Sequence, residues 1–142
     1  MSTTTNVQLS KMMAGHPLFH GVFTRDELPS VLKTGGYIMN LDSSHGHINH
    51  DGKLIHGSHW TGIYAFPDHT MMYFDSYGFS APSNLISRWK KQFHTLYYNT
   101  SIQQKFNTCN CGQLVVAFLK VAEHGIGAIA KWIHSHELLS YT

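Results

Sequence analysis

The chain has 142 residues, of which 42% are hydrophobic and 13% charged, and its formal net charge is +2. This length supports one hydrophobic core and excludes two domains of ordinary size, so we expect residues 1–142 to form a single domain with a loose arm at residues 1–6. A charge this small does not by itself predict nucleic-acid binding. No apolar run approaches the roughly 18 residues of a membrane span, and residues 1–11 lack the pattern of a secretory signal.

The two cysteines, Cys109 and Cys111, are separated by one residue. A disulfide between them would require unusual geometry, so the pair is a poor disulfide framework. Both are expected to be thiols, which indicates a reducing, intracellular compartment.

The first third of the chain alternates short apolar segments with turns. The pattern predicts a short helix over residues 7–13 and a strand over residues 36–41. Between them, Thr24–Glu27 has the capping-box spacing of one helical turn, which Pro29 limits. Residues 43–58 are rich in Gly, His, Asn and Ser, which is typical of a loop, and long loops inside compact domains are usually functional.

Two strand candidates, residues 59–66 and 71–75, flank a turn centred near Pro67. Their composition and the turn chemistry between them predict an antiparallel hairpin. Pairing about that centre would bring His59 roughly opposite Asp75.

The second half of the chain is dominated by helical patterns. Pro82 suits the first position of a helix that runs to about residue 93. From Cys111 onward the chain is continuously apolar, which indicates a buried helix closed by glycines near residue 125. The remaining candidates are a strand over 95–98, a further strand over 101–104 and a helix over 128–133. The expected fold class is α+β, with a small mixed sheet packed against helices and Cys111 at the start of the buried central helix.

Cys111 has the position that thiol chemistry requires. Free N–H groups and the dipole at a helix N-terminus lower a thiol pKa, and the same donors can hold a developing oxyanion. Gly112 leaves room beside the sulfur for a substrate backbone. A cysteine at a helix start is more often a buried small hydrophobe, so this position alone does not identify a nucleophile.

A nucleophilic thiol also needs a base and a group that orients the base. His59 and Asp75 fill these roles if the hairpin forms as expected, and Gln104 is placed to donate its side-chain amide to the oxyanion. The competing nucleophile is Cys109, but its turn-like surroundings and the Cys-Gly step favour Cys111.

The chain then shows a resemblance to a known family. Gly57-Ser58-His59-Trp60, Tyr73 to Phe79, Gln104 and Cys111-Gly112 resemble the adenain-like cysteine proteases of adenoviruses, other double-stranded DNA viruses and mobile elements. The order His, acidic residue, Gln, Cys-Gly is shared with the SUMO and ubiquitin-like-protein proteases of the same clan. The similarity spans roughly residues 19–119 and depends on the combined motif.

The resemblance implies a cysteine endopeptidase that cleaves viral or mobile-element precursor proteins near glycine during particle maturation. It assigns His59, Asp75 and Cys111 to the triad and Gln104 to the oxyanion hole. The flanking residues expected to contact substrate are Gly57, Ser58, Trp60 and Gly112. The implied location is an infected host cell, with packaging in the virion as a further expectation, and the chain is expected to be monomeric.

The sequence requires no cofactor. The resemblance offers a non-covalent activating peptide or DNA, whereas the lack of cysteine before Cys109 argues against a disulfide-linked activator. Weak DNA binding by the basic positions Arg88, Lys90 and Lys91 is an alternative to an ordinary solvated helix face.

Two alternative functions stay open at this point. One is a protease of the same clan that acts on ubiquitin or SUMO, and the other is a non-catalytic interaction module with the same fold. Histidines at positions 45, 47, 50 and 56 invite a zinc hypothesis, but they lack Cys or carboxylate ligands at fixed spacing, and we expect no metal site.

Overall fold

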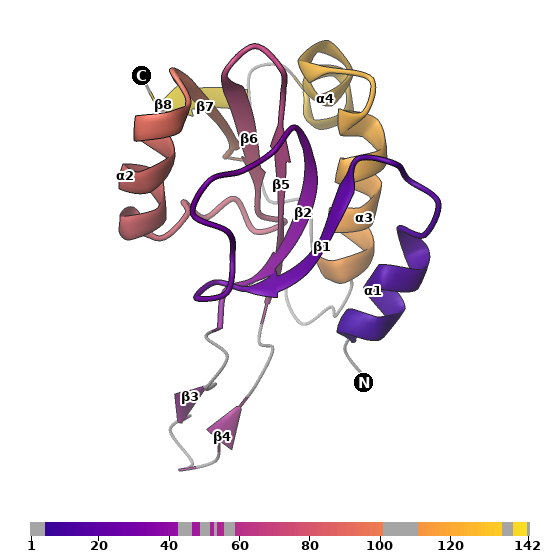
Figure 1. Ribbon diagram of the computed structural model, residues 1–142, viewed down its shortest axis with the longest axis vertical. Helices are drawn as coiled ribbons and strands as arrows, with labels where there is room; N and C mark the ends of the chain where they lie inside the picture. The colour runs from indigo at the N-terminus through magenta and orange to yellow at the C-terminus, as the bar shows by residue number, and fades with distance from the viewer. Residues whose placement is uncertain are drawn as a thin grey trace.

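A computed structural model describes residues 5–42, 47–48, 52, 54–55, 59–100, 111–134 and 138–141. Its main feature is a six-stranded mixed sheet with helices on both faces (Figure 1), so the predicted α+β fold class is confirmed. The strands of this sheet lie in the order β1-β2-β5-β6-β7-β8. Their bounds are β1 Phe19–Thr24, β2 Gly35–Asn40, β5 Trp60–Ala65, β6 Thr70–Phe74, β7 Thr95–Asn99 and β8 Leu138–Tyr141.

The two strand pairs that include β5 are antiparallel, the pairs on either side of them are parallel, and the last pair is antiparallel again. β5 pairs antiparallel with β2 and β6, and β7 pairs antiparallel with β8. β1 pairs in parallel with β2, as does β7 with β6. The start of β5 and the end of β6 therefore lie at the same end of the sheet.

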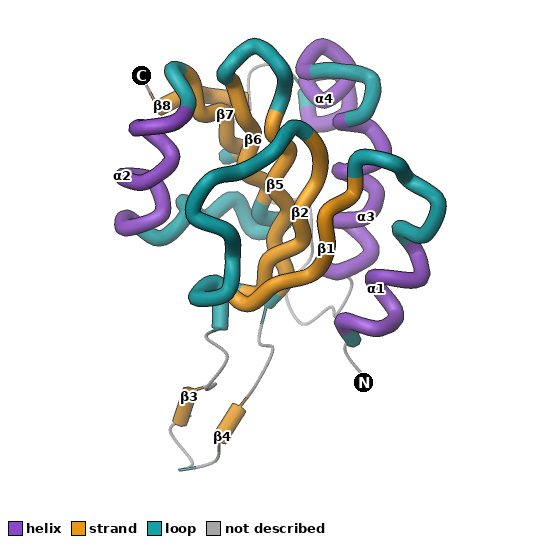
Figure 2. The backbone as a smooth tube through the Cα atoms, viewed as in Figure 1, coloured by secondary structure: helices purple, strands orange, loops and turns teal. Residues whose placement is uncertain are grey.

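In the described part of the chain, four helices pack against the sheet. The tube view shows helices beside both of its faces (Figure 2). Their bounds are α1 Asn6–Met12, α2 Ser83–Gln92, α3 Cys111–Ala122 and α4 Ile126–Ile133. Helices α1, α3 and α4 lie on one face, and α2 lies on the other. Successive side chains of a strand point to opposite faces, so β5 contributes Trp60 and Tyr64 to the α3 side and Ile63 and Ala65 to the α2 side.

Several expectations differ from the structure at the edges of the sheet. Residues 19–24, for which no strand was expected, form the edge strand β1. The opposite edge strand, β8, was not expected. Part of the predicted 43–58 loop forms a two-stranded ribbon of β3 His47–Ile48 and β4 Leu54–Ile55, which projects from the main sheet in Figure 1. The strand expected over 101–104 lies outside the described residues.

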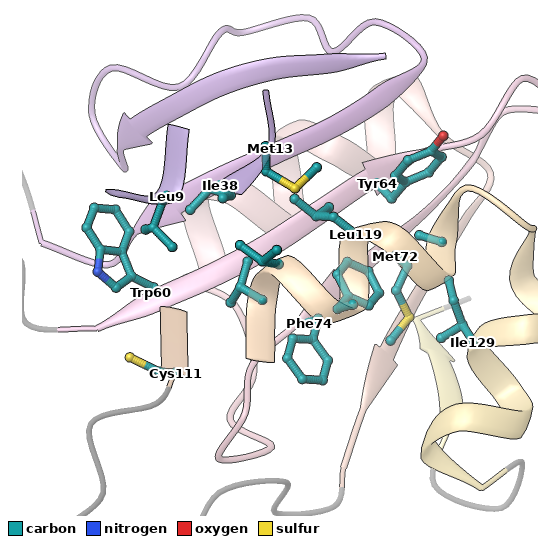
Figure 3. Packing of buried hydrophobic residues seen from close by; sticks show 14 of the residues in the cluster. Leu9, Met13, Ile38, Trp60, Tyr64, Met72, Phe74, Cys111, Leu119 and Ile129 are labelled. Atoms are coloured by element: carbon teal, nitrogen blue, oxygen red, sulfur yellow. The ribbon is translucent and has the colours of Figure 1, made fainter. Parts of the chain in front are cut away.

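Helix α3 packs directly across β5, and stacked aromatic rings fix its position. Phe74 of β6 and Phe118 of α3 have ring centroids 4.9 Å apart and planes within 8° of each other. Figure 3 shows Phe74 beside this helix and Cys111 at its first turn. The packing of α3 thus determines where Cys111 lies relative to the strand ends.

The close crossing of α3 over β5 depends on Gly62. A Cβ atom at this position would lie 2.9 Å from Phe118 Cδ2 and 3.0 Å from Val115 Cγ1, which is too close. We expect Gly62→Ala to lower the free energy of unfolding by about 1–3 kcal/mol, the usual cost of overpacking a core. Urea unfolding followed by circular dichroism measures this loss.

Gly127 in α4 provides the matched control, because a Cβ atom there meets no atom within 4 Å. Gly127→Ala is expected to leave stability unchanged or to raise it by up to about 1 kcal/mol, since alanine favours a helix more than glycine does. Equal unfolding midpoints for the two variants would contradict the proposed close packing at Gly62.

Candidate active site

The hairpin of β5 and β6 brings His59 and Asp75 together at one end of the sheet. His59 immediately precedes β5, and Asp75 immediately follows β6. His59 Nε2 lies 2.9 Å from Asp75 Oδ1, within hydrogen-bond distance. The expected pairing of these two side chains is therefore present in the structure.

The register of the hairpin differs from the expected one. Gly62 is opposite Phe74, so continuing the ladder places Asp75 opposite Thr61, and His59 is offset by two residues. The cause is the turn, a three-residue loop in which Phe66 N–H donates to Thr70 O and His69 has a positive φ of 62°. Loops of this kind carry a left-handed residue at the third position. Residues offset by two still share a face of the sheet, within reach of long side chains.

Asp75 is fully buried and its carboxylate is held in one orientation. Oδ1 accepts the His59 hydrogen bond and a second one from the backbone N–H of Tyr77 at 2.8 Å. The backbone carbonyl of Asp75 accepts from Gly78 N–H in a tight turn, where Gly78 has a φ of 75°. Because a carboxylate only accepts, His59 donates from Nε2, so Nδ1 is the ring nitrogen available to the thiol.

Cys111 is the first residue of α3, and its free thiol is 8% exposed. Burial raises the pKa of the thiol, but this effect is outweighed by hydrogen bonds from His59 and from the backbones of Trp60 and Gly112, together with the charge of His59. The resulting pKa lies below the ordinary value for cysteine. Trp60 and Gly112, expected to contact substrate, thus adjoin the sulfur through their backbones.

The pKa of His59 moves in the opposite direction. Burial lowers it, but the hydrogen bonds and charges of Asp75 and Cys111 outweigh burial and raise the pKa from 6.5 to about 9. A raised imidazole pKa and a lowered thiol pKa favour a thiolate–imidazolium pair near neutral pH. Such a pair supplies a nucleophile and a general acid at the same place.

Tyr77 is a neighbour of His59 that sequence reasoning used only as part of a motif. The two ring centroids are 5.2 Å apart with an interplanar angle of 32°. An aromatic ring at this distance stabilises an imidazolium cation and limits its rotation. The exposed ring of Phe79 follows at 6.1 Å from Tyr77 and extends this aromatic surface. Only the ring geometry reveals this role, because no residue spacing encodes it.

Several predicted site residues lie outside the described part of the chain. Gln104, Gly57, Ser58 and the alternative nucleophile Cys109 belong to this group, so their assignments stay predictions. The side chains of the histidines at 45, 47, 50 and 56 are also not described. Among the residues that are described, no three metal-ligating side chains form a cluster, and no helix is long and apolar enough to cross a membrane.

The fold resembles that of a solved protease structure. The particular structure is the crystal structure of ASFV pS273R protease, which superposes with a TM-score of 0.58 at 16% sequence identity. The match covers 91% of this chain and 60% of the ASFV protease chain, so this chain spans less than two thirds of that protein. No family model and no curated protein matched the sequence. At this identity the likeness establishes a common fold.

Proposed function

We propose that the chain is a cysteine endopeptidase in which Cys111 is the nucleophile, His59 the general acid and base, and Asp75 the group that orients His59. The observation that carries this proposal is the 2.9 Å contact between His59 and Asp75 beside a thiol at a helix N-terminus. The lowered pKa of Cys111 and the raised pKa of His59 support it. The fold shared with a protease agrees with it.

The mechanism follows from these positions. The Cys111 thiolate attacks the scissile carbonyl carbon, and the carbonyl electrons move to oxygen. The backbone N–H of Cys111 at the start of α3, with the amide of Gln104 in its predicted role, stabilises this oxyanion. The tetrahedral intermediate collapses to a thioester as the His59 imidazolium gives its proton to the leaving amine. His59 then removes a proton from water, whose attack releases the acid product and the thiol.

The proposed substrate is a polypeptide with small residues, glycine above all, next to the cleaved bond. The resemblance to adenain-like proteases supports this choice and points to viral precursor proteins processed in an infected cell or particle. The lack of a side chain at Gly112, beside the sulfur, is consistent with an extended substrate backbone near the thiol. An activating peptide or DNA remains part of the proposal, so cleavage assays should include duplex DNA in parallel.

The pH dependence of Cys111 alkylation tests the ion pair without any assumption about substrate. We expect iodoacetamide to modify Cys111 with a midpoint well below the ordinary cysteine value of about 8.5. His59→Ala should return the midpoint to that value or above it, because burial without the imidazolium raises a thiol pKa. Peptide mapping by mass spectrometry identifies which cysteine reacts.

The peptidase proposal would be contradicted if the pH midpoint of Cys111 alkylation were that of an ordinary cysteine and did not change in His59→Ala. Such a result would favour a non-catalytic interaction module. Glycine-containing peptides and ubiquitin or SUMO vinyl sulfone probes then separate the proteolytic alternatives. Probe labelling without peptide cleavage would instead identify a protease for ubiquitin-like proteins.

A further inference from the structure

Asn99 is a buried polar residue with no part in the chemistry described above. It is the last residue of β7 and is 1% exposed. Its Oδ1 accepts from the backbone N–H of Asp75 at 3.0 Å, and its Nδ2 donates to the backbone carbonyl of Asp75 at 2.6 Å. One side-chain amide thus binds both backbone groups of the residue that orients His59.

The position of Asn99 explains why these two bonds form. The parallel pairing of β6 and β7 extends to Tyr73 opposite Tyr98, and Asp75 lies just beyond the end of β6. A primary amide has the same acceptor and donor as a peptide group. The Asn99 side chain therefore takes the place of a strand backbone just beyond the end of the β6–β7 ladder. It forms the two hydrogen bonds to the Asp75 backbone that a paired strand would otherwise form.

We propose that Asn99 is a positioning residue, which fixes the Asp75 backbone so that the Asp75 carboxylate meets His59 Nε2. This inference rests on the proposed function and extends it to a residue outside the Cys111, His59 and Asp75 set. In metal sites, removing a hydrogen bond that orients a ligand through a second residue costs about 10- to 100-fold in affinity or activity, and we expect an effect of similar size here.

The position of the Asp75 carboxylate depends mainly on the position of the Asp75 backbone. Oδ1 already accepts two hydrogen bonds, while the buried Oδ2 has no partner among the described residues. Within the described part of the chain, only Oδ1 of the carboxylate is held, so a shift of the backbone would move the carboxylate away from His59. Asparagine suits position 99 because aspartate offers no donor and serine supplies one short hydroxyl in place of two groups.

Asn99→Ala is expected to lower kcat by about 10- to 100-fold with little change in KM, because Asp75 does not contact the substrate in the proposed mechanism. It should also move the midpoint of Cys111 alkylation to higher pH, since a displaced Asp75 supports the imidazolium less. Among the described residues, the titratable groups around Asp75 are His59 and Tyr73, and those around His59 are Asp75, Cys111 and Tyr77. Asn99→Ser, which replaces the amide by one hydroxyl that can donate or accept, should give a smaller loss of kcat.

Gln92 at the end of α2 provides a matched control. Its side-chain amide binds one residue in the same way, accepting from Leu32 N–H at 2.9 Å and donating to Leu32 O at 2.6 Å. Gln92→Ala removes the same two kinds of hydrogen bond on the other face of the sheet. It should lower the unfolding midpoint and leave both kcat per folded molecule and the alkylation profile unchanged.

The two variants separate positioning from stability. Equal kcat and equal alkylation profiles in Asn99→Ala and Gln92→Ala would overturn the inference, as would a change in KM alone. If Asn99→Ala does not fold, Asn99→Ser decides by the same measurements. The two proposals fail separately, because alkylation needs no substrate. An ordinary wild-type Cys111 midpoint that His59→Ala does not change refutes the proposed function, while an Asn99→Ala profile equal to that of a responsive wild-type chain refutes the positioning role.

Discussion

Cys111→Ala is expected to abolish peptide cleavage, with a loss of about 10⁴- to 10⁶-fold in kcat/KM, the range for removing the nucleophile of a triad. The side chain is small and stands at the first position of α3, so the variant should fold with a loss of less than about 1 kcal/mol. Cleavage of a glycine-containing peptide, followed by liquid chromatography with purified protein, measures the effect.

Cys109→Ser is the control for this experiment, since Cys109 is the other candidate nucleophile in the sequence. Its activity should equal that of the unmodified chain. Full activity in Cys111→Ala together with lost activity in Cys109→Ser would move the nucleophile to Cys109.

The same Cys111→Ala variant has a second observable in the titration of His59. Hydrogen bonding to Cys111 and the charge of its thiolate both contribute to the raised pKa of about 9. Removing the thiol removes these contributions while burial continues to lower the pKa, so the His59 pKa should fall below 9. NMR titration of the imidazole carbon protons measures it, and a value that stays at 9 would show that Cys111 does not face His59.

Local patterns predicted the elements that position the site. The turn chemistry between residues 66 and 71 predicted the hairpin, Pro82 marked the start of α2, and the apolar run after Cys111 marked α3. Each of these signals depends on neighbouring residues. For this reason the α+β class could be predicted before any pairing between distant strands was known.

The edges of the sheet could not be predicted in the same way. β1 pairs with β2 in parallel across a long connection, and β8 pairs with β7 about forty positions earlier in the chain. A four-residue segment such as Leu138–Tyr141 has too short a pattern to identify as a strand. The hairpin register differs from the expected one by two residues, because the left-handed conformation of His69, a non-glycine residue, is not evident from sequence.

In the candidate site, too, some residues could be predicted from sequence and others could not. The order of His59, Asp75 and Cys111 was read from residue types that thiol chemistry needs, and the structure brings the three together. Asn99 and Tyr77 were missed because their contacts depend on where β7 ends and how the turn after Asp75 folds. Residues that support a reacting group through their geometry leave no motif in a single sequence.

Asp75→Ala is expected to lower kcat by about 10³- to 10⁴-fold, close to the effect of removing the carboxylate from other triads. The substitution leaves two donors, His59 Nε2–H and the backbone N–H of Tyr77, without their shared acceptor in a buried place. The imidazole can then rotate or adopt the other tautomer, and Nδ1 no longer faces the thiol in a fixed orientation. Asp75→Asn should lose less, because an amide oxygen can still accept both bonds and Cys-His-Asn sites are functional in other folds.

Asp75→Ala is also expected to change the pH dependence of kcat/KM in a definite direction. Asp75 raises the pKa of His59, so its removal lowers that pKa from about 9 and moves the alkaline limb of the kcat/KM profile to lower pH. A weaker imidazolium in turn supports the thiolate less, so the acid limb moves to higher pH and the active range narrows from both sides. Asp68→Ala, in the exposed turn between β5 and β6, is the control and should leave both limbs unchanged. If kcat/KM of Asp75→Ala is lower at every pH but both limbs keep their midpoints, Asp75 supports the fold and does not set the charge of His59.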